Sequence, residues 1–448
     1  MEIRGPRPFK AHLQCIECNT TYDLHQVLYR CKKCDGLVDV VHDLEALKQV
    51  PAQEWKDGFA SRFGHPTYPY SSGVWGKKEW VLPEIDSSHV VSLGEGATPL
   101  IELPRLARHW GVSSLQVKQC GVSHTGSFKD LGMTVLVSHV VSLRAKGLGI
   151  RAVACASTGD TSAALAAYAA AADVPVIVFL PHGKISTAQL VQPLSNGSIV
   201  VSLDTDFDGC MEIVREVTKD ESIYLANSMN PLRIEGQKTI SVELAQQRSW
   251  QLPDWIVIPG GNLGNVSALA QGIRLLKEMG LVEKTPSICV AQSEKANPLY
   301  LSYVKGLQEL QKVQAGKTLA SAIQIGNPVS YPRAVRALRD FHGVVEQANE
   351  DELSNAAALA DRHGLFNDPH TGVALACTQK LISNGTIKAD QSVVVISTAH
   401  GLKFSEFKTG YHDGTLADVD PKYANQPIRL PASTDKVLAA IHDRLNKN

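Results

Sequence analysis

The stretch His124-Thr125-Gly126-Ser127-Phe128-Lys129-Asp130 places a lysine just after a turn of small residues. Far downstream, an apolar strand-like run leads into a glycine-rich turn, Pro259-Gly260-Gly261-Asn262-Leu263-Gly264-Asn265. The backbone N–H groups of such a turn can surround an anion of phosphate size. Neither signal is specific alone, because glycine turns are common and most lysines are solvated surface charges. Together they predict a site that combines a nucleophilic amine with a phosphate cradle.

Such a combination suits pyridoxal phosphate (PLP), whose aldehyde forms a Schiff base with a lysine. Two further segments fit the same chemistry. Ser157-Thr158-Gly159-Asp160-Thr161-Ser162 opens an Ala-rich helix, where free N–H groups and hydroxyls can bind an anion such as a substrate carboxylate. Ser397-Thr398-Ala399-His400-Gly401 follows an apolar strand, and ligands of open α/β sheets bind at such strand ends.

Composition narrows the class of protein. The 448 residues are enough for two or three domains, and 44% hydrophobic residues with a net charge of −1 are typical of a globular protein. The charge balance gives no support to a nucleic-acid or membrane partner. No apolar stretch reaches the roughly 18 residues of a membrane span. The first residues lack the apolar core of a signal peptide, so we expect a cytoplasmic protein that acts on a small molecule.

The nine cysteines fall into two groups. Cys15 with Cys18 and Cys31 with Cys34 form two CxxC pairs, with twelve residues between the pairs. Four thiolates in tetrahedral geometry favour Zn²⁺, so the spacing predicts a zinc-ribbon-like segment with a closed structural site. The alternatives are two disulfides or four free thiols. We expect the remaining cysteines to be buried thiols of a reducing compartment: Cys120, Cys155, Cys210, Cys289 and Cys377.

From about residue 95, short apolar strands alternate with helical patterns, which implies parallel βαβ units. The first series has expected strands at 152–156, 176–180, 199–203 and 223–225, and expected helices at 161–172, 186–192 and 207–219. The second series has strands at 255–259 and 287–292 around a helix near 266–278, and it closes at 393–397. We therefore expect two α/β lobes with a cleft between them.

Six segments resemble threonine synthase, a family of fold type II PLP enzymes. They are GEGATPL at 94–100, HTGSFKD at 124–130, STGDTS at 157–162, NSMNPLRIEGQKT at 227–239, GGNLGN at 260–265 and STAHG at 397–401. The likeness covers nearly the whole chain and is closest in look to the plant-type branch. The segment 227–239 is the most discriminating, because other type II enzymes lack it. The resemblance implies two three-layer α/β lobes with the active site between them, and usually a homodimer.

The resemblance also implies a division into domains. The zinc-ribbon-like segment covers residues 1–45, and an N-terminal extension that packs on the core covers 46–94. Residues 95–122 and 227–430 form the large PLP-binding domain, residues 123–226 form the small α/β domain, and a C-terminal tail covers 431–448.

Family roles carried onto matching positions assign the cofactor site. Lys129 would hold PLP and later act as the base. Asp160 stands where many members have Asn beside the 3′-oxygen of PLP, and a carboxylate there is favourable only if one of the two groups carries a proton. Thr398 would face the pyridine nitrogen and favour its unprotonated form. The phosphate cradle would consist of Gly261, Asn262, Leu263, Gly264 and Asn265.

The implied reaction converts O-phospho-L-homoserine and water into L-threonine and phosphate, by γ-elimination followed by addition of water at Cβ. The leaving phosphate needs a cation, and Arg233 offers a guanidinium fork for it, whereas the alternative for Arg233 is a surface salt bridge. Neutral donors for this phosphate would be Asn227 and Ser228, and Lys238 is a further candidate cation. The substrate carboxylate would be held by Thr158 and Thr161. His124 and His400 flank site motifs and are equally compatible with a structural role.

Other readings remain open at this stage. Cysteate synthase or threonine dehydratase would use the same scaffold, and the former could keep a phosphate clamp. A non-catalytic protein that binds nucleic acid through the ribbon is a distant alternative, because only Arg30, Lys32 and Lys33 form a small basic cluster there.

Overall fold

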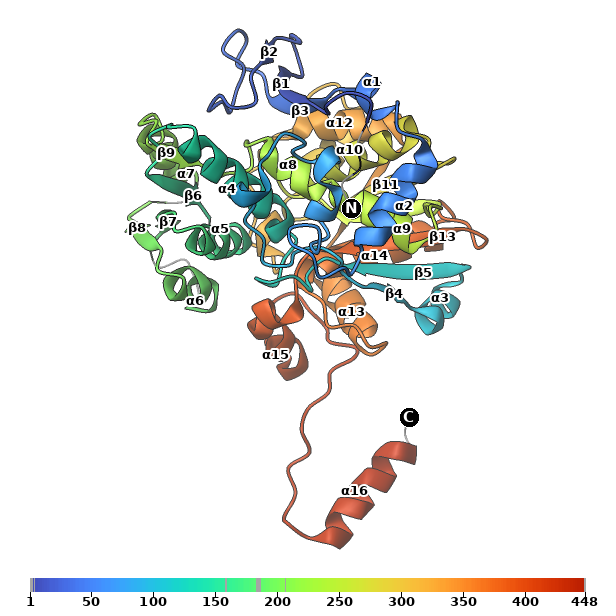
Figure 1. Cartoon of the computed structure of the whole chain (residues 1–448). Coiled ribbons are helices and arrows are strands. Elements are labelled where there is room, and N and C mark those ends of the chain that lie inside the picture. The colour runs from blue at the N-terminus through green and yellow to red at the C-terminus, as the bar shows by residue number, and fades with distance from the viewer. Residues whose placement is uncertain (1–2, 4, 158, 183–186, 206, 447–448) are drawn as a thin grey trace.

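The computed structural model of the chain describes residues 3, 5–157, 159–182, 187–205 and 207–446 (Figure 1). Three sheets organise the described chain. The largest has six strands in the order β12 (Val344–Ala348), β11 (Ser287–Ser293), β10 (Trp255–Pro259), β13 (Ser392–Ser397), β5 (Ser114–Gln119) and β4 (Leu100–Glu102). All neighbouring strands in it are parallel except β4 and β5.

The second sheet is entirely parallel. Its strand order is β8 (Ile199–Leu203), β7 (Val176–Pro181), β6 (Ala152–Ala156) and β9 (Ile223–Leu225). All four strands were predicted from the sequence, with one strand end moved by one residue. Parallel strands need long crossover connections, and helices supply them here.

Helices cover both large sheets. The helices of this part of the chain are α3 (Pro104–Trp110), α4 (Lys129–Ala145), α5 (Asp160–Ala171), α6 (Thr187–Ser195), α7 (Phe207–Val217), α8 (Leu232–Gln237), α9 (Thr239–Gln247), α10 (Gly264–Glu278), α11 (Pro298–Val304), α12 (Tyr331–Asp340), α13 (Glu350–Asp361), α14 (Pro369–Ser383) and α15 (Ser405–Asp413). A further helix, α16 (Thr434–Asn446), buries none of its residues and covers neither sheet. Short 3₁₀ turns, η3 (Ser321–Ile323) and η4 (Gly401–Phe404), also contribute to the site described below.

Each large sheet is the middle layer of three. In β10, Ile256 and Ile258 pack in one cluster with residues of α10 and α12, while Val257 packs in another with residues of α13 and α14. The same alternation holds in β6, where Val153 packs with residues of α5 and Ala154 with residues of α7. Since successive side chains of a strand point to opposite faces, both faces of each sheet are buried. The expected fold of two three-layer α/β lobes is confirmed.

The N-terminal part forms a third, antiparallel sheet, in the order β2 (Thr21–Tyr22), β1 (Ala11–Cys15) and β3 (Val38–His42). After α1 (Leu44–Leu47) and α2 (Ala52–Arg62), the chain passes through η1 (Trp75–Trp80) and η2 (Ser87–His89). Trp55, Phe59 and Trp80 pack edge-to-face or tilted against one another and against residues of α9 and α10. The sequence-based domain boundary after residue 45 falls inside α1, and the division into domains stays a prediction.

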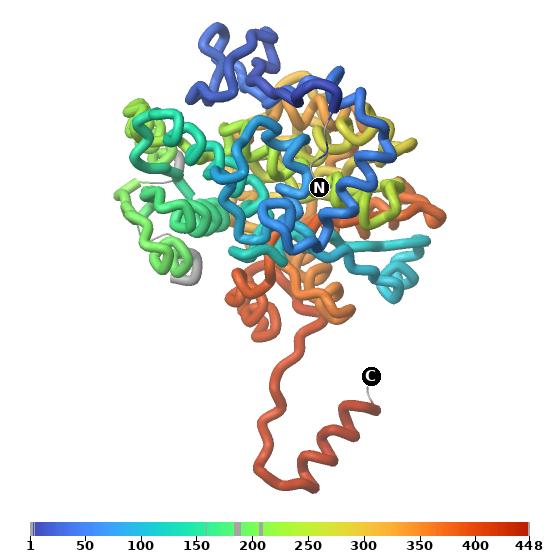
Figure 2. Tube along the Cα trace, in the orientation of Figure 1, coloured from blue at the N-terminus to red at the C-terminus, as the bar shows by residue number. Residues whose placement is uncertain are grey.

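Some elements differ from the sequence-based expectation. The helix expected at 186–192 runs over Thr187–Ser195 and contains Pro193, and its expected first residue lies outside the described part of the chain. The second series also includes β4, β5 and β12, which were not predicted. Past α15 the chain leaves the body in an extended segment and ends in α16 (Figure 2). Among the described helices, none combines the length and the apolar composition that crossing a bilayer requires.

Candidate active site

Lys129 begins α4, and the turn that follows β13 holds the loop before it. The N–H of Phe128 donates to the carbonyl of Thr398, and the N–H of His400 donates to the carbonyl of Gly126, both at 2.9 Å. Gly126 has a φ of +82°, a left-handed conformation that glycine adopts without a steric penalty. The sequence-distant motifs around Lys129 and Thr398 therefore form one wall.

The amine of Lys129 lies in a cavity without a polar partner. Within the described chain, its Nζ makes no hydrogen bond and no ion pair, and it sits 3.9 Å from the centre of the Phe128 ring. Burial lowers the pKa of Lys129 to about 7, and the Arg233 guanidinium adds to this, while Asp160 opposes it. An ordinary lysine has a pKa near 10.4, so an unusually large share of this amine is neutral at neutral pH. That is the form in which an amine acts as a nucleophile or a base.

The glycine turn after β10 faces the same cavity. A Cβ on Gly260 would lie 2.4 Å from Cγ1 of Val290, and one on Gly261 would lie 3.0 Å from Cα of Ile323. Leu263 adopts φ +65°, so the chain turns sharply into α10. At Gly260 and Gly261 the turn therefore has room for a hydrogen atom but not for a methyl group.

The first turn of α10 supplies donors to this region. N–H groups at a helix start have no intrahelical partner and carry partial positive charge, which suits a phosphate. Asn265 donates from Nδ2 to the carbonyl of Pro259 at 2.6 Å, and the carbonyl of Asn262 accepts from the N–H of Ser330 at 3.1 Å. These bonds fix the loop, so its free N–H groups are held in place before a ligand arrives.

The turn between β6 and α5 forms the opposite wall. The hydroxyl of Ser157 accepts from the N–H groups of Gly159 and Ser162, both at 3.2 Å. Asp160 forms an ion pair with Lys403 at 2.9 Å. Thr158, which the sequence assigned to the substrate carboxylate, lies outside the described residues.

Arg233 of α8 is a cation with no anionic partner among the residues that the structure describes. Its Nη2 donates to the hydroxyl of Thr161 and its Nη1 to the carbonyl of Ala226, both at 3.3 Å. Its Nε is buried with no hydrogen-bond partner in the described chain, and burial lowers the pKa of Arg233 to about 10. A buried guanidinium held only by neutral groups is costly unless an anion joins it, so the alternative of a surface salt bridge is wrong.

The other residues of the segment 227–239 divide into two groups. Ser228 lines the cavity. Asn227 also lines it, but its amide is bonded to the main chain of Ala156, accepting at 3.0 Å and donating at 2.9 Å. Lys238 does not line the cavity and instead forms a buried cluster with Glu235 and His42. Lys238 is therefore removed from the candidate phosphate ligands.

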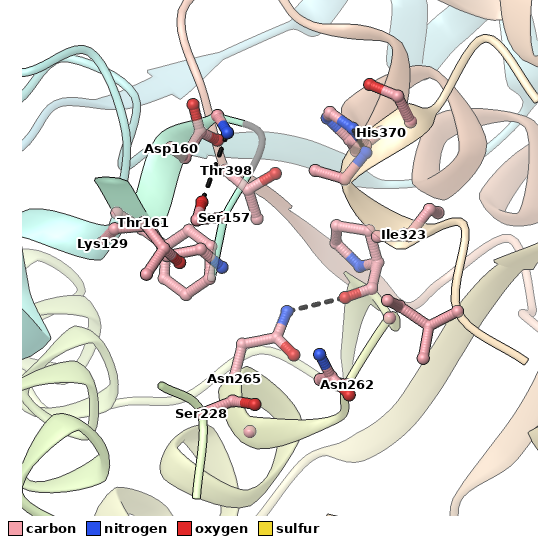
Figure 3. Close-up of a pocket in the computed structure, with 18 of the residues that line it drawn as sticks. Lys129, Ser157, Asp160, Thr161, Ser228, Asn262, Asn265, Ile323, His370 and Thr398 are labelled. Carbon is pink, nitrogen blue, oxygen red and sulfur yellow. Dashed lines mark hydrogen bonds between the residues drawn. The ribbon is translucent and has the colours of Figure 1, made fainter. Parts of the chain in front are cut away.

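Figure 3 shows side chains from both lobes around this space. The cavity has a volume of about 380 Å³, within the usual range of roughly 300–1,000 Å³ for small-molecule sites. Apart from Lys238, the described residues that were predicted to bind the cofactor or the substrate line it. These are Lys129, Asp160, Thr161, Asn227, Ser228, Arg233, Gly261, Asn262, Leu263, Gly264, Asn265 and Thr398. His124 and His400 do not line it.

Sequence reasoning missed a histidine in the wall. His370 lies near the start of α14, with its Nδ1 2.5 Å from Oδ1 of Asp368 and its Nε2 accepting from the N–H of Ala322 at 2.9 Å. Asp368 also accepts from the N–H of Ala399 at 3.0 Å. This pair thus connects η3 to the residue next to Thr398. The Asp-Pro pair at 368–369 is a helix-start signal, which could have located α14 but not the cavity.

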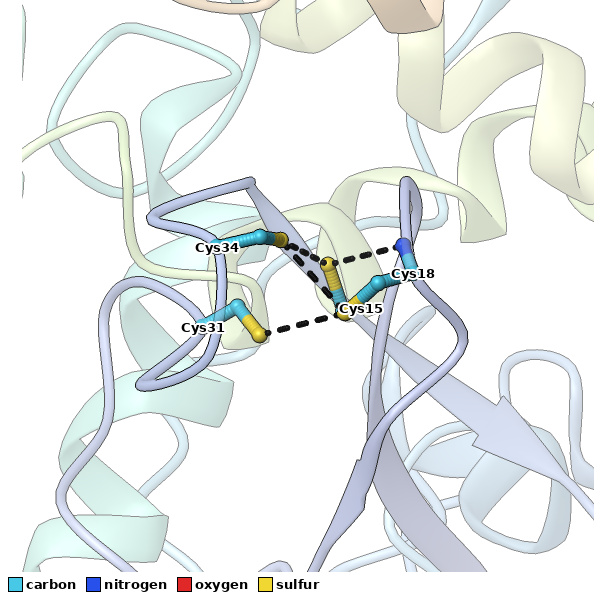
Figure 4. Close-up of side chains that lie close together, drawn as sticks. All are labelled: Cys15, Cys18, Cys31 and Cys34. Carbon is cyan, nitrogen blue, oxygen red and sulfur yellow. Dashed lines mark hydrogen bonds between the residues drawn. The ribbon is translucent and has the colours of Figure 1, made fainter.

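The four thiols of the CxxC pairs converge from two loops of the N-terminal sheet (Figure 4). Their sulfur atoms all lie within 4.8 Å of one another, with separations of 3.5 Å for Cys15–Cys34 and for Cys18–Cys31. A disulfide needs about 2.05 Å, so the disulfide alternative is not what the structure has.

Comparisons with known proteins agree with this site. A family model described as "Pyridoxal-phosphate dependent enzyme" matches residues 91–399. The chain is 51% identical over 443 residues to threonine synthase 2, chloroplastic, of Arabidopsis thaliana, covering 98% of this chain and 85% of that protein. It is 38% identical over 391 residues to threonine synthase of Methanocaldococcus jannaschii, covering 87% and 92%.

Solved structures show the same fold. Threonine synthase from Escherichia coli aligns with a TM-score of 0.65 at 20% identity, covering 97% of this chain and all of that one. Threonine deaminase isoform 2 from Solanum lycopersicum aligns with a TM-score of 0.57 at 18% identity, covering 70% and 87%. From its motifs, its cavity and its relatives, the chain belongs to the pyridoxal-phosphate dependent enzyme family and, within it, to the threonine synthases.

Proposed function

We propose that this chain converts O-phospho-L-homoserine and water into L-threonine and phosphate, with PLP bound at Lys129. One observation carries the choice of substrate: a buried guanidinium, Arg233, shares a cavity with the Lys129 amine and has no carboxylate partner in the described chain. A substrate phosphate supplies the missing anion.

The residues present fit PLP. Lys129 provides a partnerless amine, the turn 261–265 and the first N–H groups of α10 provide the phosphate cradle, and Thr398 provides a hydroxyl at the end of β13. Bound PLP supplies an electron sink that makes loss of protons from Cα and Cβ and expulsion of phosphate accessible. We propose that these residues hold it.

The residues of this chain would position the reacting groups and transfer protons. Lys129, with its lowered pKa, can take a proton from Cα and return it within the same cavity. The Asp368–His370 pair keeps the imidazole as an acceptor at Nε2, which fixes the Ala322 main chain above the cavity. This bond holds η3 at the cavity wall without placing a further acid at the reacting carbons.

Arg233 and its neighbours would act on the leaving group. The guanidinium gains most when negative charge develops on the departing phosphate. Ser228 adds a neutral donor, and Thr161 lies where it can reach the substrate while it bonds to Arg233. We propose that Asn227 contributes by holding the main chain of Ala156, and that Thr158 belongs to the carboxylate site.

The test is the Arg233→Ala variant. We expect kcat/KM for O-phosphohomoserine to fall about two orders of magnitude, on the scale of one or two lost charge-assisted contacts. PLP content should stay normal, and Arg233→Lys should recover only part, because an ammonium cannot fork. Arg274→Ala is the matched control, since Arg274 lies on α10 and pairs with Asp340 outside the cavity. Normal turnover by Arg233→Ala would place the phosphate site elsewhere.

We also propose that Cys15, Cys18, Cys31 and Cys34 hold one structural Zn²⁺. A tetrahedral ion with Zn–S bonds of about 2.3 Å separates its sulfurs by about 3.8 Å, near the spacings found here. The set is closed, with four soft ligands and no position left for a substrate.

The assembly and location of the chain are proposals as well. We propose a homodimer, supported by the exposed apolar residues Val437, Leu438, Ile441 and Leu445 of α16, which a second copy could cover. Sedimentation of the full chain tests this.

A cytoplasmic location stays a sequence-based prediction, and the name of the Arabidopsis relative places that protein in the chloroplast.

A further inference from the structure

Lys403 is a cavity cation that the reaction described above does not use. It lies in η4, and its ammonium group donates to the carbonyl of Thr125 at 3.0 Å and to Oε1 of Gln192 at 3.1 Å, and it forms an ion pair with Oδ1 of Asp160 at 2.9 Å. The ammonium group therefore has three partners, one of which is a carboxylate. A surface lysine seldom has such a complete set of partners.

The three partners of Lys403 come from three separate segments of the chain. Asp160 begins α5 and Gln192 belongs to α6, both in the lobe of the four-stranded sheet. Thr125 belongs to the loop before Lys129, and Gln192 also donates to its carbonyl at 3.1 Å. Lys403 itself follows β13 of the other lobe. The ammonium group therefore joins the two lobes at the cavity wall.

Lys403 also balances a buried charge. The side chains of Lys403 and Asp160 are 18% and 7% exposed, so their attraction is poorly screened by water. Lys403 is the cation that pairs with Asp160 within the described chain. Loss of its charge would leave a buried carboxylate near the Lys129 amine.

We propose that Lys403 is a positioning residue that holds the carboxylate of Asp160 in a neutral pair, so that the amine of Lys129 meets no net charge from this wall. The proposal deepens the proposed function, because it rests on Lys129 as the group that captures PLP. It also explains how a chain with Asp at position 160 avoids an unbalanced carboxylate beside the cofactor.

Other titratable and charged groups also lie around Lys129. Arg233 of α8 is a cation that stays in place in all the variants below. His370 of α14 accepts from the N–H of Ala322 at its Nε2. Asp130, next to Lys129, is bonded to the N–H and hydroxyl of Thr125, and burial raises its pKa to about 6. The pair Asp160–Lys403 thus acts on the pKa of Lys129 with two opposite charges, since Asp160 raises this pKa and Lys403 lowers it.

The experiment measures the rate at which the apoprotein captures PLP, followed by absorbance from pH 5 to 10. In Lys403→Met, the unpaired Asp160 stabilises the protonated amine, so the midpoint of the rate profile should move up by about one pH unit. In Asp160→Asn, the unpaired Lys403 should move it down by a similar amount. The double variant Lys403→Met/Asp160→Asn should return close to the unmodified chain, and Lys403→Arg should keep the original midpoint.

Lys408→Met is the matched control. Lys408 also pairs with a carboxylate, that of Asp361, but this pair lies outside the cavity. It should leave the midpoint unchanged.

If Lys403 acts only by holding Thr125 and Gln192 in place, Lys403→Met should weaken PLP binding without moving the midpoint of the rate profile. This result separates a structural role of Lys403 from an electrostatic one. The inference is overturned if Lys403→Met keeps the original midpoint, or if the double variant stays shifted like Lys403→Met. Failure of the unmodified apoprotein to capture PLP would instead contradict the proposed function. If Lys403→Met does not fold, Asp160→Asn alone decides, since an unmoved midpoint contradicts the proposal.

Discussion

Single residues in the cavity differ in how their charge is balanced. Lys129 has no polar partner in the described chain, Arg233 is held only by neutral groups, and Lys403 forms an ion pair with Asp160. These three states correspond to three tasks: nucleophile, anion receptor and scaffold. The pKa of Lys129 allows a direct test of its role as the nucleophile.

We expect the apoprotein to capture PLP about ten times faster at pH 8 than at pH 6, and then to reach a plateau. Burial lowers the pKa of Lys129 to about 7, so its neutral form, scarce below this pH, is nearly complete one unit above it. Stopped-flow absorbance measures the capture. Lys129→Ala should show none while keeping its circular dichroism spectrum. A rate that continues to rise up to pH 10 would mean that Lys129 titrates as an ordinary lysine.

At the residue level, the sequence located the motif residues but not their partners. Lys129, Arg233 and the turn 261–265 stand in short patterns whose chemistry can be read locally. The pairing of Lys403 with Asp160, and of His370 with Asp368, depends on where distant turns meet. Lys403 looks like one more solvated lysine in the sequence, because nothing near it shows that three acceptors surround it.

At the scale of elements, the junction of β10 and α10 is tightly packed against η3. We expect Gly261→Ala to weaken PLP binding about tenfold, because its Cβ would lie 3.0 Å from Cα of Ile323 and would push η3 away from the cavity. Overpacking of this kind costs about 1–3 kcal/mol, and about 1.4 kcal/mol is a factor of ten in affinity. Equilibrium titration of the apoprotein with PLP measures it.

The matched control for this change is Gly149→Ala. Gly149 has nothing within 4 Å of the added methyl group, so PLP binding should be unaffected. Equal affinities for Gly261→Ala and the unmodified chain would show that the turn is looser than its contacts indicate.

The three-stranded sheet is the element whose stability we expect to depend on metal. We expect Cys15→Ser to lose about one zinc per chain and to lower the thermal stability of the N-terminal segment, because three ligands hold the ion poorly. Turnover should fall much less than zinc content, since the site is closed. Elemental analysis with calorimetry tests this, and Cys120→Ala, a buried thiol outside the cluster, should keep its zinc. An unmodified chain that contains no zinc would refute the proposal.

Elements were predictable where their pattern is regular. The strands of the four-stranded sheet are short apolar runs between turns, and they were found. Helix α4 was missed because it is buried on nearly all sides from Asp130 to Val140, which removes the 3.6-residue alternation. Strand β5 was missed because it contains Lys118, whose buried ammonium is paired with Glu243 of α9. A lysine in the middle of a strand does not look like a core residue in sequence alone.

At the scale of the whole molecule, the site exists only because two lobes meet. The strand ends of β6 and β9 bring the residues around Ser157 and Asn227, while those of β10 and β13 bring the glycine turn and Thr398. The rule that ligands bind at the carboxyl ends of parallel strands predicted this gathering from sequence. The contacts across the cavity through η3 and η4 could not be predicted, because they join side chains to main-chain groups, the N–H of Ala322 and the carbonyl of Thr125, which have no signature in the sequence.

The most direct test of the central claim is product formation by the unmodified full chain loaded with PLP. Phosphate and threonine should appear in a ratio of one to one from O-phospho-L-homoserine, and homoserine, which lacks the anion for Arg233, should give neither threonine nor another product at a comparable rate. O-phosphoserine with sulfite is the parallel assay for the alternative chemistry on this scaffold. Release of phosphate from O-phosphoserine with sulfite, without threonine formation from O-phospho-L-homoserine, would contradict the account.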